Sequence, residues 1–336
     1  MVIFQYSDAA LFRRGAQVEG DEFEVEPWRP RIPSAFCGPL NSANRVVRVN
    51  DMGSSTLANS TYKEAQLESL ALVDQYCWWE DERLAVRRVE GRQAPAHWLT
   101  ITYAKAGASL VLAARSQKAL DEVKAKILSQ VPSTDVLVVP TDVVDLAQIE
   151  AAVKAGSERF GKFDIVIANA GKGDGFDQSM TEKEPLEWWN MVEVNVRGVY
   201  NIAHFTLPYL SKVEGYFLVT SSIGSLLRMS NASPYSISKE AANVFVEYVA
   251  LEFPNVKAFA LHPGSVDTEM TRGANIVAED NVQLASATFL YLTAGKADWL
   301  SGKFLFVNWD MDELQRDWKD KILEGNALVS RIVIPA

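Results

Sequence analysis

The chain has 336 residues, of which 48% are hydrophobic and 23% are charged, which is an ordinary composition for a globular protein. Its formal net charge of -10 argues against a nucleic-acid-binding surface, which normally needs a basic face. No apolar run approaches the ~18 to 20 residues of a membrane span, and the first residues do not resemble a secretory signal. Two cysteines and three scattered histidines indicate neither a disulfide framework nor a metal site, so we expect a cytoplasmic protein without metal.

Residues 1–98 lack a regular pattern. Prolines between positions 27 and 33, a polar run at 50–55 and charges at 80–83 interrupt short apolar patches. One helix is predicted from Thr61 to Tyr76. The segment is too apolar and too rich in tryptophan for a simple disordered tail. We therefore treat residues 1–98 as an atypical, poorly ordered N-terminal segment, with a separate interaction module as an open alternative.

From Tyr103 onward, predicted strands and helices alternate. The predicted strands cover residues 108–114, 136–139, 163–168, 216–220, 256–261 and 303–307. The predicted helices cover residues 118–130, 146–160, 185–210, 233–253 and 282–293, before an amphipathic tail at 310–321. This alternation implies parallel strands with helices on both faces of the sheet, so residues 99–336 should form one doubly wound, Rossmann-type α/β domain.

A phenol and an ammonium stand four residues apart near the start of the predicted helix at 233–253. Ser233 can cap this helix, Pro234 suits its first position, and Tyr235 and Lys239 then lie one turn apart on the same side. A phenol ionises near pH 10 unless a nearby cation stabilises its anion. Taken alone, the pair is equally consistent with an ordinary surface tyrosine and lysine. The apolar residues predicted to form the buried face are Ile237, Ala241, Val244, Phe245, Tyr248 and Val249.

Further polar residues stand at fixed distances from Tyr235. Ser222 follows the strand at 216–220 and precedes Tyr235 by thirteen residues, and Asn195 precedes it by forty. Three other groups also follow predicted strands: Asn169-Ala170-Gly171, Asp142, and Pro263-Gly264 with Thr268. With these features in this order, the chain resembles the one-domain short-chain dehydrogenase/reductase family with the Y-x-x-x-K motif.

The resemblance implies an oxidoreductase acting on a carbonyl/alcohol pair. Tyr235 would be the general acid/base and Lys239 would lower its pKa and bind the nicotinamide ribose. Ser222 would hydrogen-bond the substrate carbonyl, and Asn195 would hold a water in the proton relay. The chemistry is consistent, because hydride transfer to a carbonyl builds negative charge on oxygen that hydroxyls beside an ammonium stabilise. Singly, Ser222 could be a strand-end cap and Asn195 a polar helix residue.

The resemblance also implies a nicotinamide dinucleotide cofactor. Asn169, Ala170 and Gly171 would pack against the adenosine ribose, and Asp142 would accept a hydrogen bond from the adenine amino group. Thr268, after the turn Pro263-Gly264, would meet the nicotinamide carboxamide. Arg115 follows the second strand, where a guanidinium can pair with a 2′-phosphate, so NADP is favoured over NAD. The alternative is an ordinary surface arginine.

The beginning of the family pattern is absent. A strand and a glycine-rich phosphate turn should end near residues 89–96, where Gly91 is the one glycine. Residues 103–108 resemble the end of the usual first helix, so the first strand and its turn are missing or replaced. Either the recorded beginning is foreign, for example through a misplaced exon boundary, or the protein is divergent and binds its cofactor poorly.

Two functions therefore remain open. The first is an NADP-dependent oxidoreductase for a small-molecule substrate, and the second is a non-catalytic member of the same fold with impaired cofactor binding. Residues 172–176 and 270–279 are expected to line the cleft, but the substrate cannot be identified from the sequence. The resemblance implies a homo-oligomer formed through the long helices that carry Asn195 and Tyr235.

Overall fold

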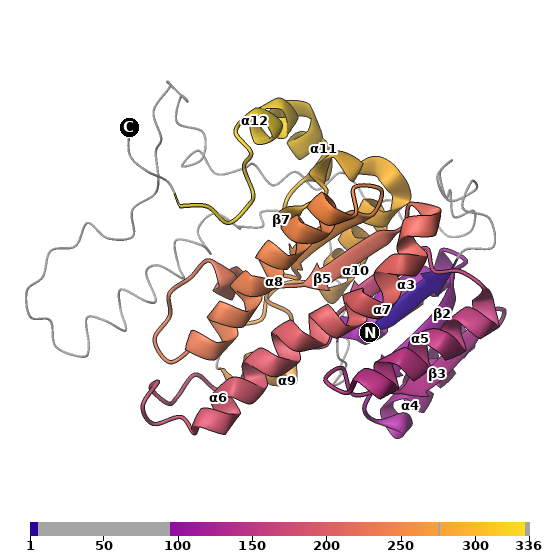
Figure 1. The fold of residues 1–336 in the computed structure, drawn as a ribbon, viewed down its shortest axis with the longest axis horizontal. Helices are drawn as coiled ribbons and strands as arrows, with labels where there is room; N and C mark the ends of the chain where they lie inside the picture. Colours follow the sequence, from indigo (N-terminus) through magenta and orange to yellow (C-terminus); the bar gives the residue numbers. More distant parts are fainter. Residues whose placement is uncertain (6–94, 275, 333–336) are drawn as a thin grey trace, which may run out of the picture. The chain divides into compact units, whose positions relative to one another are not determined.

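The computed structural model describes residues 1–5, 95–274 and 276–332. A seven-stranded sheet with the order β3-β2-β1-β4-β5-β6-β7 forms the centre of this part of the chain (Figure 1). The strands are β1 (Val2–Gln5), β2 (Ser109–Ala114), β3 (Val136–Pro140), β4 (Ile165–Ala168), β5 (Tyr216–Thr220), β6 (Lys257–His262) and β7 (Lys303–Phe306). The predicted helix at 61–76 lies outside the described residues.

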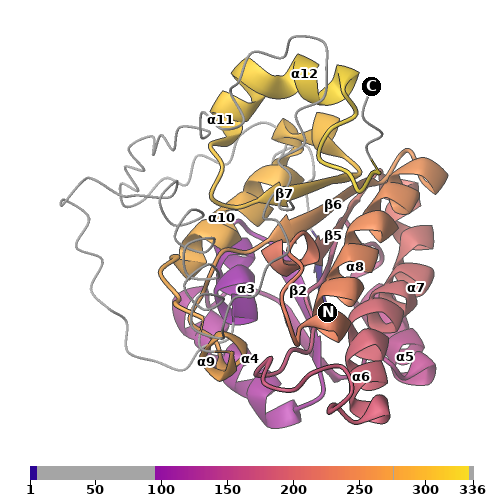
Figure 2. The ribbon, with the colours of Figure 1, turned by 90° about the vertical axis from the view of Figure 1, so that its left-hand side faces the viewer.

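Helices cover both faces of the sheet. The helices of the described residues are α3 (Pro95–Lys105), α4 (Gln117–Gln130), α5 (Leu146–Phe160), α6 (Pro185–Val192), α7 (Gly198–Val213), α8 (Ser233–Glu252), α9 (Glu269–Gly273), α10 (Val282–Tyr291), α11 (Met311–Glu313) and α12 (Lys319–Glu324). Figure 2 shows α5, α7 and α8 on one side of the strands and α3, α4 and α10 on the other. The prediction of a doubly wound α/β fold is confirmed.

The central strand β1 comes from the very start of the recorded sequence. It pairs antiparallel with both neighbours, with Ile3 opposite Val111 of β2 and Val166 of β4. The side chain of Ile3 is 1% exposed, and the backbone nitrogen of Met1 donates to Ala113 O at 2.9 Å. Without β1, the facing edges of β2 and β4 would each carry a row of unpaired backbone N–H and C=O groups. An apolar strand between them pairs with both rows and is buried on both faces of the sheet.

The direction of β1 departs from the expected all-parallel sheet. All other neighbouring pairs in this sheet are parallel, so their carboxyl ends meet at one edge. Because β1 runs the other way, the chain leaves Gln5 at the opposite edge, where the amino ends of β2 and β4 lie. The expected parallel first strand is therefore replaced by an antiparallel one, which ends at the edge opposite the carboxyl ends of the other strands.

A widened helical turn interrupts the long helix predicted at 185–210. Helices α6 and α7 are joined without a break by a π-helical turn, Glu193–Arg197, which carries Asn195. Turns of this kind are rare and frequently occur at functional sites, because they rotate the side chains that follow. Here the turn directs the buried amide of Asn195 toward α8.

Helix α8 presents a different face to the core from the one predicted. Ile237 and Tyr248 are 50% and 56% exposed, although both were predicted to be buried. Nor does Ser233 cap the helix, because its hydroxyl accepts a hydrogen bond from Trp188 Nε1 at 3.0 Å. Val249 is buried as predicted, but the prediction was wrong for Ile237 and Tyr248, because the buried face also includes polar residues of the site. The buried residues of α8 are Pro234, Ser236, Ser238, Lys239, Ala242, Asn243, Val246 and Val249.

Candidate active site

Tyr235 and Ser222 meet at the carboxyl edge of the sheet. Ser222 follows β5, is 8% exposed, and accepts a hydrogen bond from the backbone nitrogen of Gly224 at 3.0 Å. Tyr235 lies in the first turn of α8 and hydrogen-bonds the Ser222 side chain. Burial raises the pKa of Tyr235, and the hydrogen bond with Ser222 opposes this shift. The phenol is therefore protonated at neutral pH and positioned to donate a proton.

The ammonium of Lys239 lies beneath this pair. Lys239 is 5% exposed, and its Nζ lies 5.8 Å from the centre of the Tyr235 ring. The ammonium donates a hydrogen bond to Thr220 O at 2.8 Å. Burial lowers the pKa of Lys239 to about 8, so the charged form still predominates at pH 7. A cation at this distance stabilises negative charge that develops on the phenol oxygen.

The side chain of Asn195 holds the loop that follows β4. Its Oδ1 accepts from Lys172 N at 2.7 Å, and its Nδ2 donates to Lys172 O at 2.9 Å. Nδ2 also donates to Ser238 Oγ at 2.9 Å, and Ser238 Oγ donates to Tyr235 O at 2.8 Å. Both amide donors are thus used, and the second lone pair of Oδ1 is what remains for a water. Asn195 links the loop at 172–176 to the first turn of α8.

Two glycines leave room for the reactive groups. A Cβ at Gly224 would lie 3.2 Å from Cε1 of Tyr235 and 3.3 Å from Oγ of Ser222. A Cβ at Gly171 would lie 3.2 Å from Nζ of Lys239 and 3.4 Å from Oδ1 of Asn195. The absence of these side chains keeps Tyr235 close to the sheet and leaves an exposed approach to the ammonium.

The loop after β4 covers one side of the tyrosine. The ring of Phe176 lies 5.6 Å from the ring of Tyr235, at an angle of 53°. Gly173 packs against α9, because a Cβ there would lie 2.8 Å from the sulfur of Met270. The segments 172–176 and 269–273, which are far apart in the sequence, therefore lie together beside the predicted catalytic residue Tyr235.

The residues predicted to hold the adenosine half of a dinucleotide lie at the same edge but apart from one another. Asn169, Ala170 and Gly171 follow β4, and Asn169 Oδ1 accepts from Thr220 Oγ1 at 2.9 Å. Arg115 is exposed after β2 and makes no hydrogen bond to the described residues. Asp142 follows β3 and accepts from Val144 N at 3.1 Å, which leaves its outer carboxylate oxygen available to a ligand.

The turn after β6 requires glycine. Gly264 has a φ of 81°, and a Cβ there would lie 2.7 Å from Oδ2 of Asp280. This carboxylate accepts a hydrogen bond from Ser265 N at 2.5 Å and so holds the turn after Pro263. Thr268 caps α9, with its Oγ1 accepting from Thr271 N at 3.1 Å. The backbone from 263 to 268 is consequently fixed at the mouth of the site.

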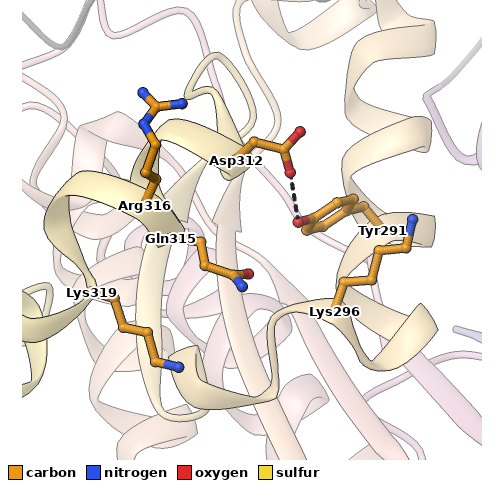
Figure 3. A pocket seen from close by; sticks show the side chains of 6 residues that line it. All are labelled: Tyr291, Lys296, Asp312, Gln315, Arg316 and Lys319. Carbon is orange, nitrogen blue, oxygen red and sulfur yellow. Dashed lines mark hydrogen bonds between the residues drawn. The ribbon is translucent and has the colours of Figure 1, made fainter.

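Two hollows in the described part of the chain contain none of the four predicted catalytic residues. One of about 630 Å³ is lined by Tyr291, Lys296, Asp312, Gln315, Arg316 and Lys319 (Figure 3). Its wall is held by a hydrogen bond of 3.3 Å from Tyr291 to Asp312. Another, of about 490 Å³, lies at the start of α5 and includes Asp142 and Arg197.

Among the described residues no cluster of three or more His, Cys, Asp or Glu side chains could hold a metal ion.

Several residues that build the site were not predicted from the sequence. Thr220 supplies the carbonyl that holds Lys239, and Ser221 Oγ donates to Asn243 Oδ1 at 2.5 Å. Asn243 Nδ2 in turn donates to Ser225 Oγ at 2.8 Å, which secures the turn that carries Ser222. Lys239 and Asn243 lie one turn apart on α8, and this spacing could have indicated a buried polar face. It was missed because the prediction assigned the apolar residues of the helix to the core.

The comparisons with known proteins identify the family. The family described as short chain dehydrogenase matches residues 96–277, and the chain belongs to this family of oxidoreductases. A short chain dehydrogenase, mpl6, of Monascus purpureus is 34% identical over 249 residues, which are 70% of this chain and 83% of that protein. The short chain dehydrogenase andI of Emericella variicolor is 31% identical over 243 residues, which are 68% of this chain and 82% of that protein.

The fold is also similar to that of solved structures. An alcohol dehydrogenase from the archaeon Thermococcus sibiricus, complexed with 5-hydroxy-NADP, has a TM-score of 0.57 and 27% identity. The match covers 63% of this chain and 90% of that structure. The family match begins at residue 96, within α3, so the strand β1 lies outside it.

Proposed function

We propose that this protein is an NAD(P)-dependent oxidoreductase that interconverts a carbonyl and an alcohol on a small organic molecule. The observation that carries the proposal is the Tyr235–Ser222 pair, hydrogen-bonded above the buried ammonium of Lys239. A nicotinamide cofactor supplies or accepts the hydride when bound. Tyr235 donates the proton to the carbonyl oxygen during reduction and takes it back during oxidation.

The surrounding residues support this proton transfer. Ser222 offers a second hydrogen bond to the substrate oxygen, where charge develops. Lys239 stabilises the phenolate that remains after the proton has left. Asn195 keeps the loop at 172–176 in register with α8 through its contacts with Lys172 and Ser238. We assign it a positioning role, and the free lone pair of its Oδ1 suits a water in the relay.

The residues of the carboxyl edge fit the nicotinamide half of the cofactor better than the pyrophosphate. Gly171 leaves an open approach to Lys239 Nζ, which suits a ribose hydroxyl. Thr268 lies at the fixed turn where the carboxamide would bind. Asn169 and Ala170 would pack against the adenosine ribose, and Asp142 would meet the adenine. The described residues offer no glycine-rich turn for the pyrophosphate at this edge, because β1 leads the chain away from it.

Replacement of Tyr235 by phenylalanine tests the proposed acid/base role. Tyr235→Phe keeps the ring but removes the proton, so consumption of NADPH with a panel of ketones should fall by at least about 100-fold. Tyr248→Phe, on the exposed side of the same helix, is the matched control and should retain the wild-type rate. An unchanged rate in Tyr235→Phe, with an unchanged melting temperature, would remove Tyr235 from the mechanism.

The cofactor preference is proposed from Arg115. An exposed guanidinium after β2 can form paired hydrogen bonds with a 2′-phosphate, so NADPH should bind more tightly than NADH. The 5-hydroxy-NADP complex of the archaeal relative is consistent with this preference. In calorimetry, Arg115→Leu should weaken NADPH binding about tenfold and leave NADH binding unchanged. Equal effects on the two cofactors would contradict the assignment.

The reversed direction of β1 supports a second candidate function. If the pyrophosphate has no binding turn, the protein retains the catalytic residues but acts through binding alone or not at all. Calorimetry of NADPH with the recorded chain separates the two functions. It should be compared with a chain whose first 98 residues are replaced by a family-type strand and glycine-rich turn. Binding by the replaced chain alone would favour the non-catalytic candidate.

We also propose that the protein is a cytoplasmic homo-oligomer whose contacts involve α7 and α8. Tyr200 on α7 is 52% exposed, and Tyr248 and Leu251 on α8 are 56% and 73% exposed. Large apolar side chains that remain exposed on helices can mark a protein interface. In the part of the chain that the structure describes, no helix has the length and apolarity needed to cross a bilayer.

A further inference from the structure

Phe176 adopts a backbone conformation that is unusual for a bulky side chain. Its φ is 53°, in the left-handed region that glycine and asparagine tolerate and aromatic residues rarely enter. Strain of this kind persists where the surrounding structure enforces it, and it is concentrated at functional sites. Glycine would satisfy this backbone without strain, so the aromatic side chain itself is the feature to explain.

Several contacts hold this conformation in place. The backbone nitrogen of Phe176 donates to Asp174 Oδ1 at 3.2 Å, and its carbonyl accepts from Asn231 Nδ2 at 3.2 Å. Asn231 is itself left-handed, with a φ of 65°. The other oxygen of Asp174 forms an ion pair with Lys183, which is 6% exposed. The loop is therefore fixed from both sides, and the charge of the buried Lys183 is paired with that of Asp174.

These contacts place the ring of Phe176 beside the ring of Tyr235. Its centre lies 5.6 Å from the centre of the Tyr235 ring, at an angle of 53°, and the side chain is only half-buried. The neighbouring surface is also apolar, because Met270 packs its thioether against Gly173. A molecule whose carbonyl meets Tyr235 would therefore have its substituent against the aromatic ring of Phe176.

We propose that Phe176 is a specificity-determining residue that selects carbonyl compounds with a flat, aromatic group next to the carbonyl. The proposal rests on the function proposed above for the same site. An aromatic substituent gains an offset or edge contact with the Phe176 ring that a saturated ring of similar size does not match. The Phe176 ring acts on substrate choice, while Tyr235 and Ser222 act on the carbonyl.

Two ketones that differ only in ring saturation test this proposal. Acetophenone and cyclohexyl methyl ketone are reduced with NADPH by wild type, Phe176→Ala, Phe176→Leu and the control Leu323→Ala, at an exposed position of α12. The ratio of kcat/KM for acetophenone to that for cyclohexyl methyl ketone should fall about three- to tenfold in both Phe176 variants. It should stay unchanged in Leu323→Ala. Comparison between variants cancels the different intrinsic reactivity of the two ketones.

Binding without turnover separates this proposal from the proposed function. Saturation-transfer NMR compares the two ketones on wild type and on both Phe176 variants. Wild type could reduce neither ketone yet bind acetophenone more tightly, with the variants losing that preference. This result would support the role of Phe176 in selectivity and contradict the proposed catalytic function. The proposed role of Phe176 is overturned if the preference for acetophenone over cyclohexyl methyl ketone, in rate or in binding, stays within twofold of wild type in the folded variants. Phe176→Leu keeps the apolar volume and decides the test if Phe176→Ala does not fold.

Discussion

The buried ammonium of Lys239 links the chemistry of the site to the stability of the fold. Burial lowers the pKa of Lys239 to about 8 from its ordinary value of 10.5. Between these values the unfolded chain binds more protons than the folded one, so this group makes the fold more stable as pH rises. The gain is complete above pH 10.5 and absent below pH 8.

This linkage predicts a pH-dependent effect of Lys239→Met. The variant lacks the buried charge, so the difference in unfolding free energy, wild type minus variant, should rise by about 3 kcal/mol between pH 7 and pH 10.5. Urea unfolding of both proteins at the two pH values measures this difference. Subtracting the variant cancels other groups that titrate in the same range. A constant difference would show that Lys239 keeps an ordinary pKa in the folded protein.

The two hydrogen bonds between the Asn195 side chain and the backbone of Lys172, which together clamp the loop at 172–176, give a second prediction for a single residue. Asn195→Ala leaves the backbone groups of Lys172 without their partners, so the free energy of unfolding should fall by about 1–3 kcal/mol. Hydrogen exchange at the Lys172 amide should accelerate, which a merely destabilised core would not produce locally. Asn190→Ala, at an exposed position of α6, is the control and should alter neither quantity. Slow exchange at Lys172 in Asn195→Ala would contradict the clamp.

For single residues, spacing along the sequence was enough to predict that the Tyr235 hydroxyl and the Lys239 ammonium lie close together. It did not predict the contacts that hold them. Tyr235 and Lys239 lie one helical turn apart, so their proximity follows from helix geometry alone. The contact of Phe176 with Tyr235 joins segments separated by a strand and two helices. Its left-handed backbone is set by Asn231 and Asp174, and no local pattern indicates it.

Among the elements, β1 makes the most direct prediction. Ile3 is buried between β2 and β4, so Ile3→Ala should lower the free energy of unfolding by about 2–4 kcal/mol. Leu323→Ala, at a side chain that is 47% exposed, should change it by less than about 1 kcal/mol. Urea unfolding measures both. If Ile3→Ala costs no more than Leu323→Ala, the strand does not occupy the centre of the sheet.

The elements after residue 108 could be predicted because each carries its own signal. The strands at 216–220 and 136–139 are apolar runs, and their predicted positions agree with β5 and β3 within a residue. The strand β1 could not be predicted in the same way. Four residues carry too little pattern, and the reason for their strand is the open slot between β2 and β4, which exists only in the folded sheet.

For the whole molecule, the exposed side of α8 predicts how copies associate. The apolar residues that sequence patterning assigned to the core lie partly on the surface, with Tyr248 and Leu251 at 56% and 73% exposure. The double variant Tyr248→Asp/Leu251→Asp should shift the protein from oligomer to monomer in size-exclusion chromatography with light scattering, because a charge in an apolar interface is unfavourable. A wild type that is already monomeric would end the proposal.

The strand β1 also has a consequence for the order of folding. Its partners lie more than a hundred positions away, since Val2 pairs with Leu112 and with Ile167. During synthesis the first residues emerge long before β4 exists, so the centre of the sheet must stay open until the chain has passed residue 168. Closing so long a loop is slow. The strand β1 is thus made before both of its partners but pairs with them late, and until then β2 and β4 present unpaired edges to other chains.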